Sequence, residues 1–312
     1  MPINTPILSR QDELTVQGIL NGTHVYPHEC VNIEQLAAGY EPFLGRDQAK
    51  NIKIVRALVA SSYAPEVRLG LRMALCQRSR RCQSLFCVVC AYRHLSHFLG
   101  DIESLCGENQ RSGIIWVTVI AGVTDGGTPP VEELIGCARH RWSAALETAS
   151  SHDPAFREIR WRGRFEVDLL RGSAQLKKNK RKCLTELGWR DEPRTPWLIP
   201  HLHAAVSLGE IAPERLEYCL RREFKASYQV VFKRQHRNKT VETNLRNMAG
   251  YALKADLPES SAVHPSVSGT TPTAARRGRY DDAELRFYAR MMDDLGGLRG
   301  TLDFSRLNDT SA

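Results

Sequence analysis

The segment between residues 113 and 255 alternates between short apolar runs and amphipathic stretches, and this alternation restricts the possible folds more than any other feature. The run at 113–121 is β-branched and apolar, as in a buried strand, and residues 163–170 alternate with the period of a half-buried strand. Further strands are expected at 197–208 and 228–232, and helices at 131–146, 213–226 and 243–255. Strands and helices interleaved in this way predict a mixed α/β or α+β core.

The rest of the chain divides into regions of different composition. We expect a mostly helical N-terminal region, a Cys-rich segment, a main domain, a linker rich in Ser, Thr, Pro and Gly, and a C-terminal helix with a tail. Their boundaries are 1–71, 72–100, 101–257, 258–280 and 281–312, and the last helix is expected at 282–295. Within the main domain, the polar and basic residues 171–196 are expected to form a long loop.

The chain is basic, with a formal net charge of +8 at pH 7 and a pI of about 9.1. A basic balance suits a polyanionic partner such as nucleic acid. No apolar run approaches the roughly 20 residues that a membrane span needs, and the N-terminus shows no secretory signal. A cytoplasmic protein with no membrane partner is therefore expected.

Two histidines, His201 and His203, lie within the strand expected at 197–208. Side chains two positions apart point to the same face of a strand, so both imidazoles can converge on one cation. Glu166 lies on a neighbouring expected strand and offers a carboxylate, with Asp168 at the same period. Two histidines and one carboxylate form a workable site for a divalent ion that keeps positions open for a substrate. The alternative is that all of them are ordinary strand residues.

The helix expected at 243–255 carries a tyrosine followed one turn later by a lysine, Tyr251 and Lys254, with Thr243 as its N-cap. A phenol with its usual pKa of about 10 needs a nearby cation or metal to act as a nucleophile at neutral pH. The alternative is a half-buried tyrosine beside a lysine whose stem packs against it.

The order and spacing of these segments resemble the Rep proteins of rolling-circle plasmids, which belong to the HUH endonuclease superfamily. The resemblance lies in the strand with Thr118, the strand with Glu166, the segment Pro200-His-Leu-His-Ala-Ala-Val and the segment Ala249-Gly-Tyr-Ala-Leu-Lys. It spans about residues 72–257, including the Cys-rich segment, and it points to the one-tyrosine type. The implied fold is an α+β domain of the HUH type, with an antiparallel sheet of about five strands and helices packed behind it.

The resemblance also implies a reaction. Tyr251 would attack a phosphodiester of single-stranded or extruded origin DNA, giving a 5′-phosphotyrosine and a free 3′-OH for rolling-circle replication. His201, His203 and Glu166 would hold Mg²⁺ or Mn²⁺, and Lys254 would neutralise developing charge or position the phosphate. Origin DNA, a host helicase and a host polymerase are the implied partners.

Three features depart from the pattern of the family. Ala255 stands where two-tyrosine members have their second tyrosine. Asn247 stands where some one-tyrosine members have the glutamate that acts as the base for terminating hydrolysis, so another carboxylate such as Glu242 would have to serve. No third histidine follows the pair shortly, so Glu166 or a ligand elsewhere would complete the metal set.

Four of the nine cysteines lie within 15 residues, at Cys76, Cys82, Cys87 and Cys90. In a reducing compartment such crowding favours a metal over disulfides, and four thiolates can build a structural Zn²⁺ site. One of two nearby histidines, His94 or His97, could replace one of the first two cysteines. Buried free thiols are the alternative.

Two basic runs flank the histidine pair along the chain and are expected to contact DNA phosphates without reading sequence. They comprise Lys177, Lys178, Lys180, Arg181 and Lys182 in the first run, and Lys233, Arg234, Arg237 and Lys239 in the second. Solvated loops are the alternative interpretation.

The resemblance therefore predicts an enzyme that nicks and rejoins DNA at a specific sequence with the help of a metal. Two other functions stay open: a one-tyrosine transposase of a mobile element with the same chemistry, and a non-catalytic, zinc-containing DNA-binding regulator. A further alternative is a metal phosphodiesterase that uses His201 and His203 with activated water, which would form no covalent adduct with DNA.

Overall fold

The computed structural model describes residues 10, 14, 17, 18, 21, 51–76, 81–105, 113–127, 129–170, 176–191, 196–236, 238–252, 281–298 and 300–307. The contacts of the chain divide it into two compact units. The first unit comprises residues 1–94 and 255–298, and the second comprises residues 95–254 and 299–312. None of the described helices is both long and apolar enough to cross a membrane.

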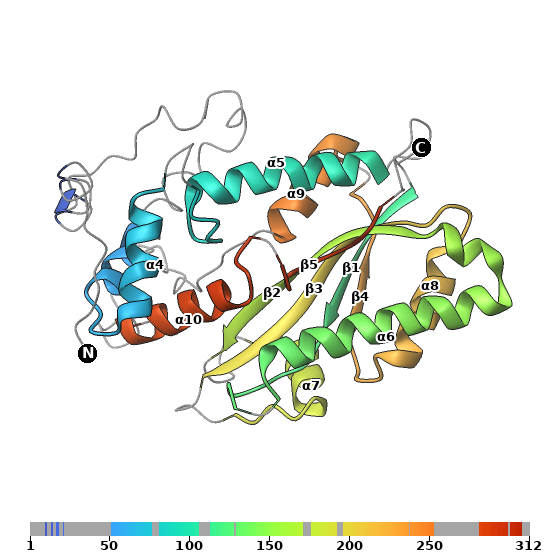
Figure 1. Cartoon of the computed structure of the whole chain (residues 1–312). Helices are drawn as coiled ribbons and strands as arrows, with labels where there is room; N and C mark the ends of the chain where they lie inside the picture. The colour runs from blue at the N-terminus through green and yellow to red at the C-terminus, as the bar shows by residue number, and fades with distance from the viewer. Residues whose placement is uncertain are drawn as a thin grey trace, which may run out of the picture. The chain divides into compact units, whose positions relative to one another are not determined.

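The second unit is an α+β fold around a five-stranded antiparallel sheet (Figure 1). The strands are β1 (Ile114–Ile120), β2 (Arg160–Leu170), β3 (Trp197–Ser207), β4 (Val230–Lys233) and β5 (Asp303–Arg306), in the spatial order β4-β1-β3-β2-β5. The first four confirm the strands expected from the sequence. No strand was expected at β5, because four residues are too short a run to show a periodic pattern.

One face of the sheet is apolar and packs against helix α6 (Val131–His152) and helix α8 (Pro213–Glu223), which also contact each other. The short helix η3 (Pro154–Glu158) follows α6 in the chain and packs against it. Trp142 of α6 is fully buried, with its ring centroid 5.9 Å from that of Trp161 and 6.0 Å from that of Phe304. Both partners point from the same face because their positions alternate with the polar positions of β2 and β5. This face supplies the main hydrophobic core of the unit.

The other face carries the polar side chains and is covered at its two ends by different helices. At one end, α9 (Val241–Ala252) packs through Leu245 and Ala249 against Trp116 and Ala205 of the sheet. The second half of α5 (Val88–Leu105) joins the same cluster through Phe98 and Ile102. Figure 1 shows α9 and α6 on opposite sides of the sheet.

At the other end of this face lies α7 (Lys178–Glu186), where the sequence analysis expected a loop. That expectation was wrong, because Cys183 and Leu184 give the basic segment a short apolar side. Both are fully buried and pack with Ile120 and Ile199 of the sheet. Tertiary packing therefore stabilises a helix that is too short and too polar to be recognised from periodicity.

The start of α9 also differs from the expectation. The Thr240 hydroxyl accepts a hydrogen bond from the backbone N–H of Thr243 at 3.2 Å, so Thr240 and not Thr243 occupies the capping position. Asn244, which is 3% exposed, donates its side-chain amide to the carbonyl of His236 and accepts from the N–H of the same residue. These bonds fix the turn that leads into α9.

The first unit contains a helical segment at residues 51–59, α4 (Ala64–Ala74), the beginning of α5, and α10 (Asp282–Asp294). The last of these confirms the C-terminal helix and begins with a capping box between Asp281 and Glu284. Glu66 of α4 is 8% exposed and contacts Arg286 at 3.2 Å and Arg290 at 3.3 Å. A buried carboxylate paired with two arginines holds α4 against α10. The linker expected at 258–280 lies outside the described residues.

Candidate functional site

The histidine pair and Glu166 come together on the polar face of the sheet. Glu166 is the cross-strand neighbour of His201, and His203 is the neighbour of Thr118 on the other side. The Nε2 atoms of His201 and His203 each lie 3.3 Å from Oε2 of Glu166. All three residues are buried, with exposures of 6–8%. The sheet register therefore builds the three-residue set that the sequence predicted.

The remaining ring nitrogens of both histidines are also engaged. Nδ1 of His201 lies 3.1 Å from the carbonyl oxygen of Ile199 and donates to it, which leaves Nε2 facing Glu166 as the nitrogen with a lone pair when the ring is neutral. Nδ1 of His203 lies 3.0 Å from the hydroxyl oxygen of Thr118, and its ring stacks on Trp116. Outer partners of this kind are typical of metal-binding histidines, whose ring orientation they fix.

The charges of the three groups influence one another strongly. Burial raises the pKa of Glu166, but the hydrogen bonds and charges of His201 and His203 outweigh it and lower this pKa to about 2. Burial lowers the pKa of His201, yet the carboxylates of Asp168 and Glu166 raise it to about 9. The pKa of His203 is lowered, mainly by burial. In the metal-free protein the negative charge of Glu166 is thus balanced by the proton of His201, and a bound metal ion would displace that proton.

The donor set fits a small divalent cation. One ligand atom from each of Glu166, His201 and His203 lies within 4.8 Å of the others. Ligands bound at about 2.1 Å are separated by about 3.0–3.4 Å in octahedral or tetrahedral arrangements, and the two 3.3 Å separations fall in this range. Three protein ligands leave coordination positions for water or a substrate. The site can therefore hold a metal in an open coordination sphere.

The predicted nucleophile lies on the helix that covers one end of this face. Tyr251 is in the last turn of α9, and its side chain is outside the described part of the structure. On β3, Ala205 belongs to the same hydrophobic cluster as Leu245 and Ala249 of α9, and His203 lies two positions before it on the same face of the strand. Lys254 and Ala255 lie outside the described residues. Glu242 forms an exposed ion pair with Arg246 at 2.6 Å.

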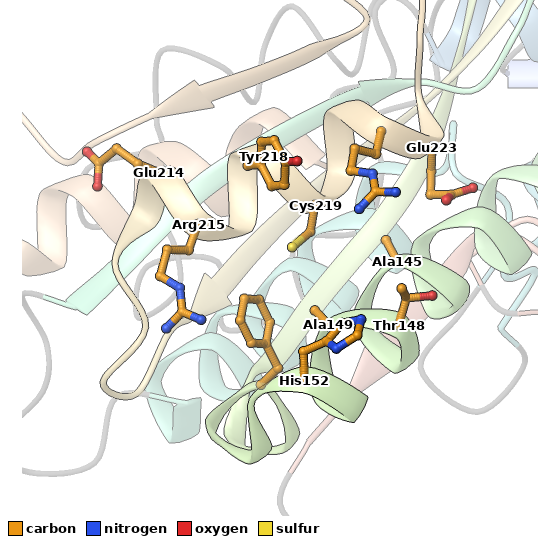
Figure 2. A pocket seen from close by; sticks show the side chains of 11 residues that line it. Ala145, Thr148, Ala149, His152, Glu214, Arg215, Tyr218, Cys219 and Glu223 are labelled. Atoms are coloured by element: carbon orange, nitrogen blue, oxygen red, sulfur yellow. The ribbon is translucent and has the colours of Figure 1, made fainter.

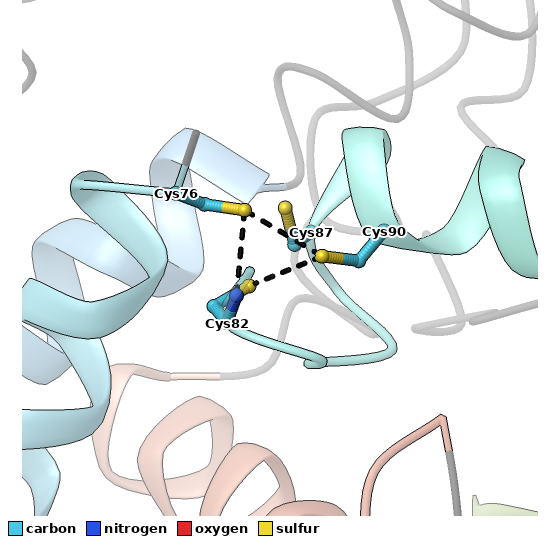
Figure 3. A group of neighbouring side chains, drawn as sticks. All are labelled: Cys76, Cys82, Cys87 and Cys90. Atoms are coloured by element: carbon cyan, nitrogen blue, oxygen red, sulfur yellow. Dashed lines mark hydrogen bonds between the residues drawn. The ribbon is translucent and has the colours of Figure 1, made fainter. Parts of the chain in front are cut away.

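The four predicted cysteines form a second group, in the first unit (Figure 3). Cys76 lies just after α4, Cys82 and Cys87 lie in the segment before α5, and Cys90 lies in the first turn of α5. Sγ of Cys90 lies 3.5 Å from Sγ of Cys76 and 3.7 Å from Sγ of Cys82. All four are buried and none is in a disulfide. His94 and His97 do not belong to the group, so the all-cysteine set is the one the structure brings together.

This cysteine cluster could bind zinc. Zn²⁺ with bonds of about 2.3 Å to four sulfurs separates these sulfurs by about 3.8 Å, close to the observed separations. Hydrogen bonds from the other cysteines lower the pKa of Cys90, whereas hydrogen bonds to them raise the pKa of Cys87. Four sulfurs would satisfy a tetrahedral ion completely, and this is typical of structural zinc.

The loop of the cysteine cluster is attached to the turn after α10. The carbonyl of Gln83 accepts a hydrogen bond from the N–H of Leu298 at 3.0 Å. Gly297 has a φ of +58°, and a Cβ at this position would lie 2.5 Å from the Gln83 oxygen. Only glycine allows this conformation and this approach without strain. A metal in the cluster would therefore also fix the end of α10.

The basic runs take several forms. Lys177 precedes α7, and Lys178, Lys180, Arg181 and Lys182 lie within it, so the first run is helical. In the second run Lys233 ends β4, Lys239 is exposed in the turn before α9, and Arg237 lies outside the described residues. Arg234 forms an exposed ion pair with Glu214 at 2.5 Å. We call Glu166, His201 and His203 the metal triad. The first run is thus part of α7 and the second precedes α9, and these two helices cover the ends of the sheet face that carries the triad.

Two ion pairs beside Glu166, His201 and His203 were not predicted from the sequence. Arg164, 1% exposed, lies beside His203 across the strands and contacts Asp303 of β5 at 2.6 Å. Lys180 of α7 contacts Asp168 of β2 at 2.8 Å. Arg164 and Asp303 are 139 positions apart, and Lys180 and Asp168 are 12 positions apart on a helix and a strand, so no local pattern predicts either pair.

A separate cavity of about 450 Å³ lies between α6 and α8 (Figure 2). Its lining includes Ala149 and His152 of α6 and Arg215 and Tyr218 of α8. Arg215 is paired with Asp153 at 2.7 Å. Among the described residues that line this cavity, none belongs to the predicted site, and α6 and α8 cover the apolar face of the sheet.

Comparisons with protein-family models, curated proteins and solved structures found no match to this chain.

Proposed function

We propose that this protein is a metal-dependent DNA nicking and joining enzyme of the HUH type, acting as a rolling-circle replication initiator with Tyr251 as its nucleophile. The observation that carries the proposal is the position of α9. This helix packs on the polar face of the sheet beside His203, so a residue in its last turn starts from the same face as the candidate metal site.

In the proposed reaction, Glu166, His201 and His203 hold Mg²⁺ or Mn²⁺. The bound ion supplies Lewis acidity at the scissile phosphate. Tyr251 loses its phenolic proton and its oxygen forms a bond to phosphorus, while the bond from phosphorus to the 3′ oxygen breaks and that oxygen takes up a proton. The products are a 5′-phosphotyrosine and a free 3′-OH. Lys254 stabilises the phenolate or the charge on the phosphate.

Single-stranded or extruded origin DNA is the proposed substrate. The basic run of α7 lies at one end of the face that carries Glu166, His201 and His203, and Lys233, the cross-strand neighbour of Trp116, points from the same face near α9, so a strand that crosses this face meets positive charge on both sides. The free 3′-OH would serve a polymerase, and a helicase would displace the nicked strand. These partners follow from the proposed reaction.

The proposal predicts a covalent intermediate. Incubation with Mn²⁺ and labelled single-stranded DNA carrying the element's origin should give a protein–DNA adduct that survives a denaturing gel. Tyr251→Phe should abolish the adduct and retain DNA binding. Tyr218→Phe is a matched control, because Tyr218 is 66% exposed on α8, on the other side of the sheet. This control should form the adduct normally.

Other results would select other functions. Cleavage without an adduct would indicate a phosphodiesterase that activates water at the same metal site. Tight binding of a verified origin with neither cleavage nor adduct would indicate a DNA-binding regulator. An adduct formed at the ends of a mobile element rather than at a replication origin would indicate a transposase with the same chemistry.

A further inference from the structure

An ion pair borders the metal triad where β2 continues beyond Glu166. Asp168 follows Glu166 by two positions and therefore points from the same face of the strand. Its Oδ2 atom lies 2.8 Å from Nζ of Lys180 on α7. The side chains of Asp168 and Lys180 are 31% and 39% exposed, whereas that of Glu166 is 9% exposed. The pair thus lies at the accessible edge of a buried site.

Both members of the pair act electrostatically on the triad. The charge of Asp168 raises the pKa of His201, and the charge of Lys180 lowers it. Lys180 is also held in place by its helix, because Cys183 and Leu184 of α7 are fully buried against the sheet. The backbone of Lys180 is therefore held in place close to the triad, while the side chains of Lys180 and Asp168 remain partly exposed to solvent.

The contact has the geometry that a phosphate would adopt. A charge-assisted hydrogen bond between an ammonium and an anionic oxygen measures about 2.7–2.9 Å, whether the oxygen belongs to a carboxylate or a phosphate. A phosphodiester, like a carboxylate, spreads one negative charge over two oxygens. An ion pair between partly exposed groups contributes little to stability, so replacing the carboxylate by a phosphate requires little free energy.

We infer that the carboxylate of Asp168 pairs with the ammonium of Lys180 in the free protein in the place of a DNA phosphate. When DNA binds, a phosphodiester of the bound strand replaces the carboxylate as the partner of Lys180. The phosphate concerned neighbours the one at the metal triad. This inference rests on the proposed function and deepens it, because it assigns to Lys180 one particular contact and to Asp168 the role of a competitor. Asp168 thereby lowers the affinity for any strand that does not also engage the triad.

The test measures DNA binding without cleavage. A fluorescein-labelled single strand of about 20 nucleotides is titrated, with no chelator and no added Mg²⁺ or Mn²⁺, with the full chain, with Asp168→Asn, with Lys180→Gln and with the double variant. Asp168→Asn should bind about 2- to 5-fold more tightly, and Lys180→Gln about 2- to 5-fold more weakly, which is the range of an exposed ion pair. Lys180→Gln should also make the slope of log affinity against log salt shallower by about 0.7.

The double variant separates exchange from a general charge effect. In the Lys180→Gln background, Asp168→Asn should give a smaller gain than in the wild type, because there is no ammonium left to release. Glu158→Gln is the matched control: it removes one negative charge from a residue whose side chain is 73% exposed just before β2, and it should leave binding unchanged.

Three results would overturn the inference. If Asp168→Asn binds DNA no more tightly than the wild type, although the wild type binds DNA and forms the adduct, the exchange fails and the proposed function survives. If Asp168→Asn instead weakens Mn²⁺ binding in a separate titration, Asp168 is a metal ligand. If the wild type neither binds single-stranded DNA nor forms an adduct, the proposed function fails and the inference fails with it.

Discussion

The two candidate metal centres of this protein are both buried but differ in the number, the chemistry and the structural origin of their ligands. The cysteine cluster offers four sulfurs from a loop and the start of a helix, all buried, in a set that a tetrahedral ion would fill. The triad of Glu166, His201 and His203 offers three atoms from two rigid, adjacent strands. A filled coordination sphere stabilises a fold, whereas an incomplete one leaves room for a substrate.

The surroundings of the two centres reinforce this difference. The cysteine loop is attached to the turn after α10, so its connections are structural. The triad is bordered by the basic helix α7, by α9 and by the Asp168–Lys180 pair, so its neighbours include partly exposed charged side chains. The comparison predicts that mutations in the cysteine cluster lower the stability of the fold, and that mutations in the triad abolish the reaction with DNA.

The largest expected effect is on stability, at the cysteine cluster. Removing zinc with a chelator, or replacing Cys90 by Ser, should lower the free energy of unfolding by more than about 3 kcal/mol, because metal binding contributes directly to folding. Zinc content by mass spectrometry and thermal unfolding measure this effect. A wild-type protein that contains no zinc and melts at the same temperature as Cys90→Ser would refute the structural role.

The second effect separates the two centres. His203→Gln keeps a polar side chain but removes one ligand nitrogen, so Mn²⁺ affinity should fall by at least about 100-fold, beyond the usual cost of losing an outer partner. Adduct formation should be lost and the zinc content of the cysteine cluster unchanged. Mn²⁺ titration followed by electron paramagnetic resonance measures the affinity. If His203→Gln binds Mn²⁺ as the wild type does, the triad is not the metal site.

A smaller effect is expected at Thr118, which contacts the outer nitrogen of His203 at 3.0 Å. Thr118→Val has nearly the same shape and lacks the hydroxyl, so it should lower Mn²⁺ affinity by about 10- to 100-fold without unfolding the sheet. Thr118→Ser restores the hydroxyl and should recover most of the affinity. Equal losses in both variants would mean that packing, not the hydrogen bond, is what matters at this position.

The smallest effect concerns the charged surface beside the triad. Lys178→Gln on α7 should weaken binding of single-stranded DNA by about 2- to 3-fold and leave Mn²⁺ affinity unchanged, because one phosphate contact is lost. Arg157→Gln, in the short helix that follows α6, is the matched control. Fluorescence anisotropy at several salt concentrations measures both. Equal losses of DNA affinity in the two variants would show that binding depends only on the net charge of the protein.

The sequence predicted those parts of the structure that depend on local periodicity. The period of two placed His201 and His203 on one face of a strand, and the crowding of four cysteines predicted a cluster. Four of the strands and the last helix were also predicted. In each case the signal lies within a short stretch of the sequence, so a pattern along the chain is sufficient to find it.

The parts that the sequence could not predict depend on register and tertiary packing. The contact of Thr118 with His203 follows from the pairing of β1 with β3, and the strand β5 is too short to show a pattern. The helix α7 forms because two buried side chains anchor an otherwise charged segment, and this anchoring brings Lys180 to Asp168. The choice of Thr240 as the cap of α9 depends on where the preceding turn is fixed.

The most direct test of the account is to identify the residue that carries the DNA. The adduct formed with Mn²⁺ is digested with nuclease and trypsin, and the peptide that retains a nucleotide is sequenced by mass spectrometry. The account predicts the peptide of residues 247–254, modified on Tyr251. A nucleotide attached to any other residue, such as the exposed Tyr228, would contradict the assignment of α9 as the helix that carries the nucleophile.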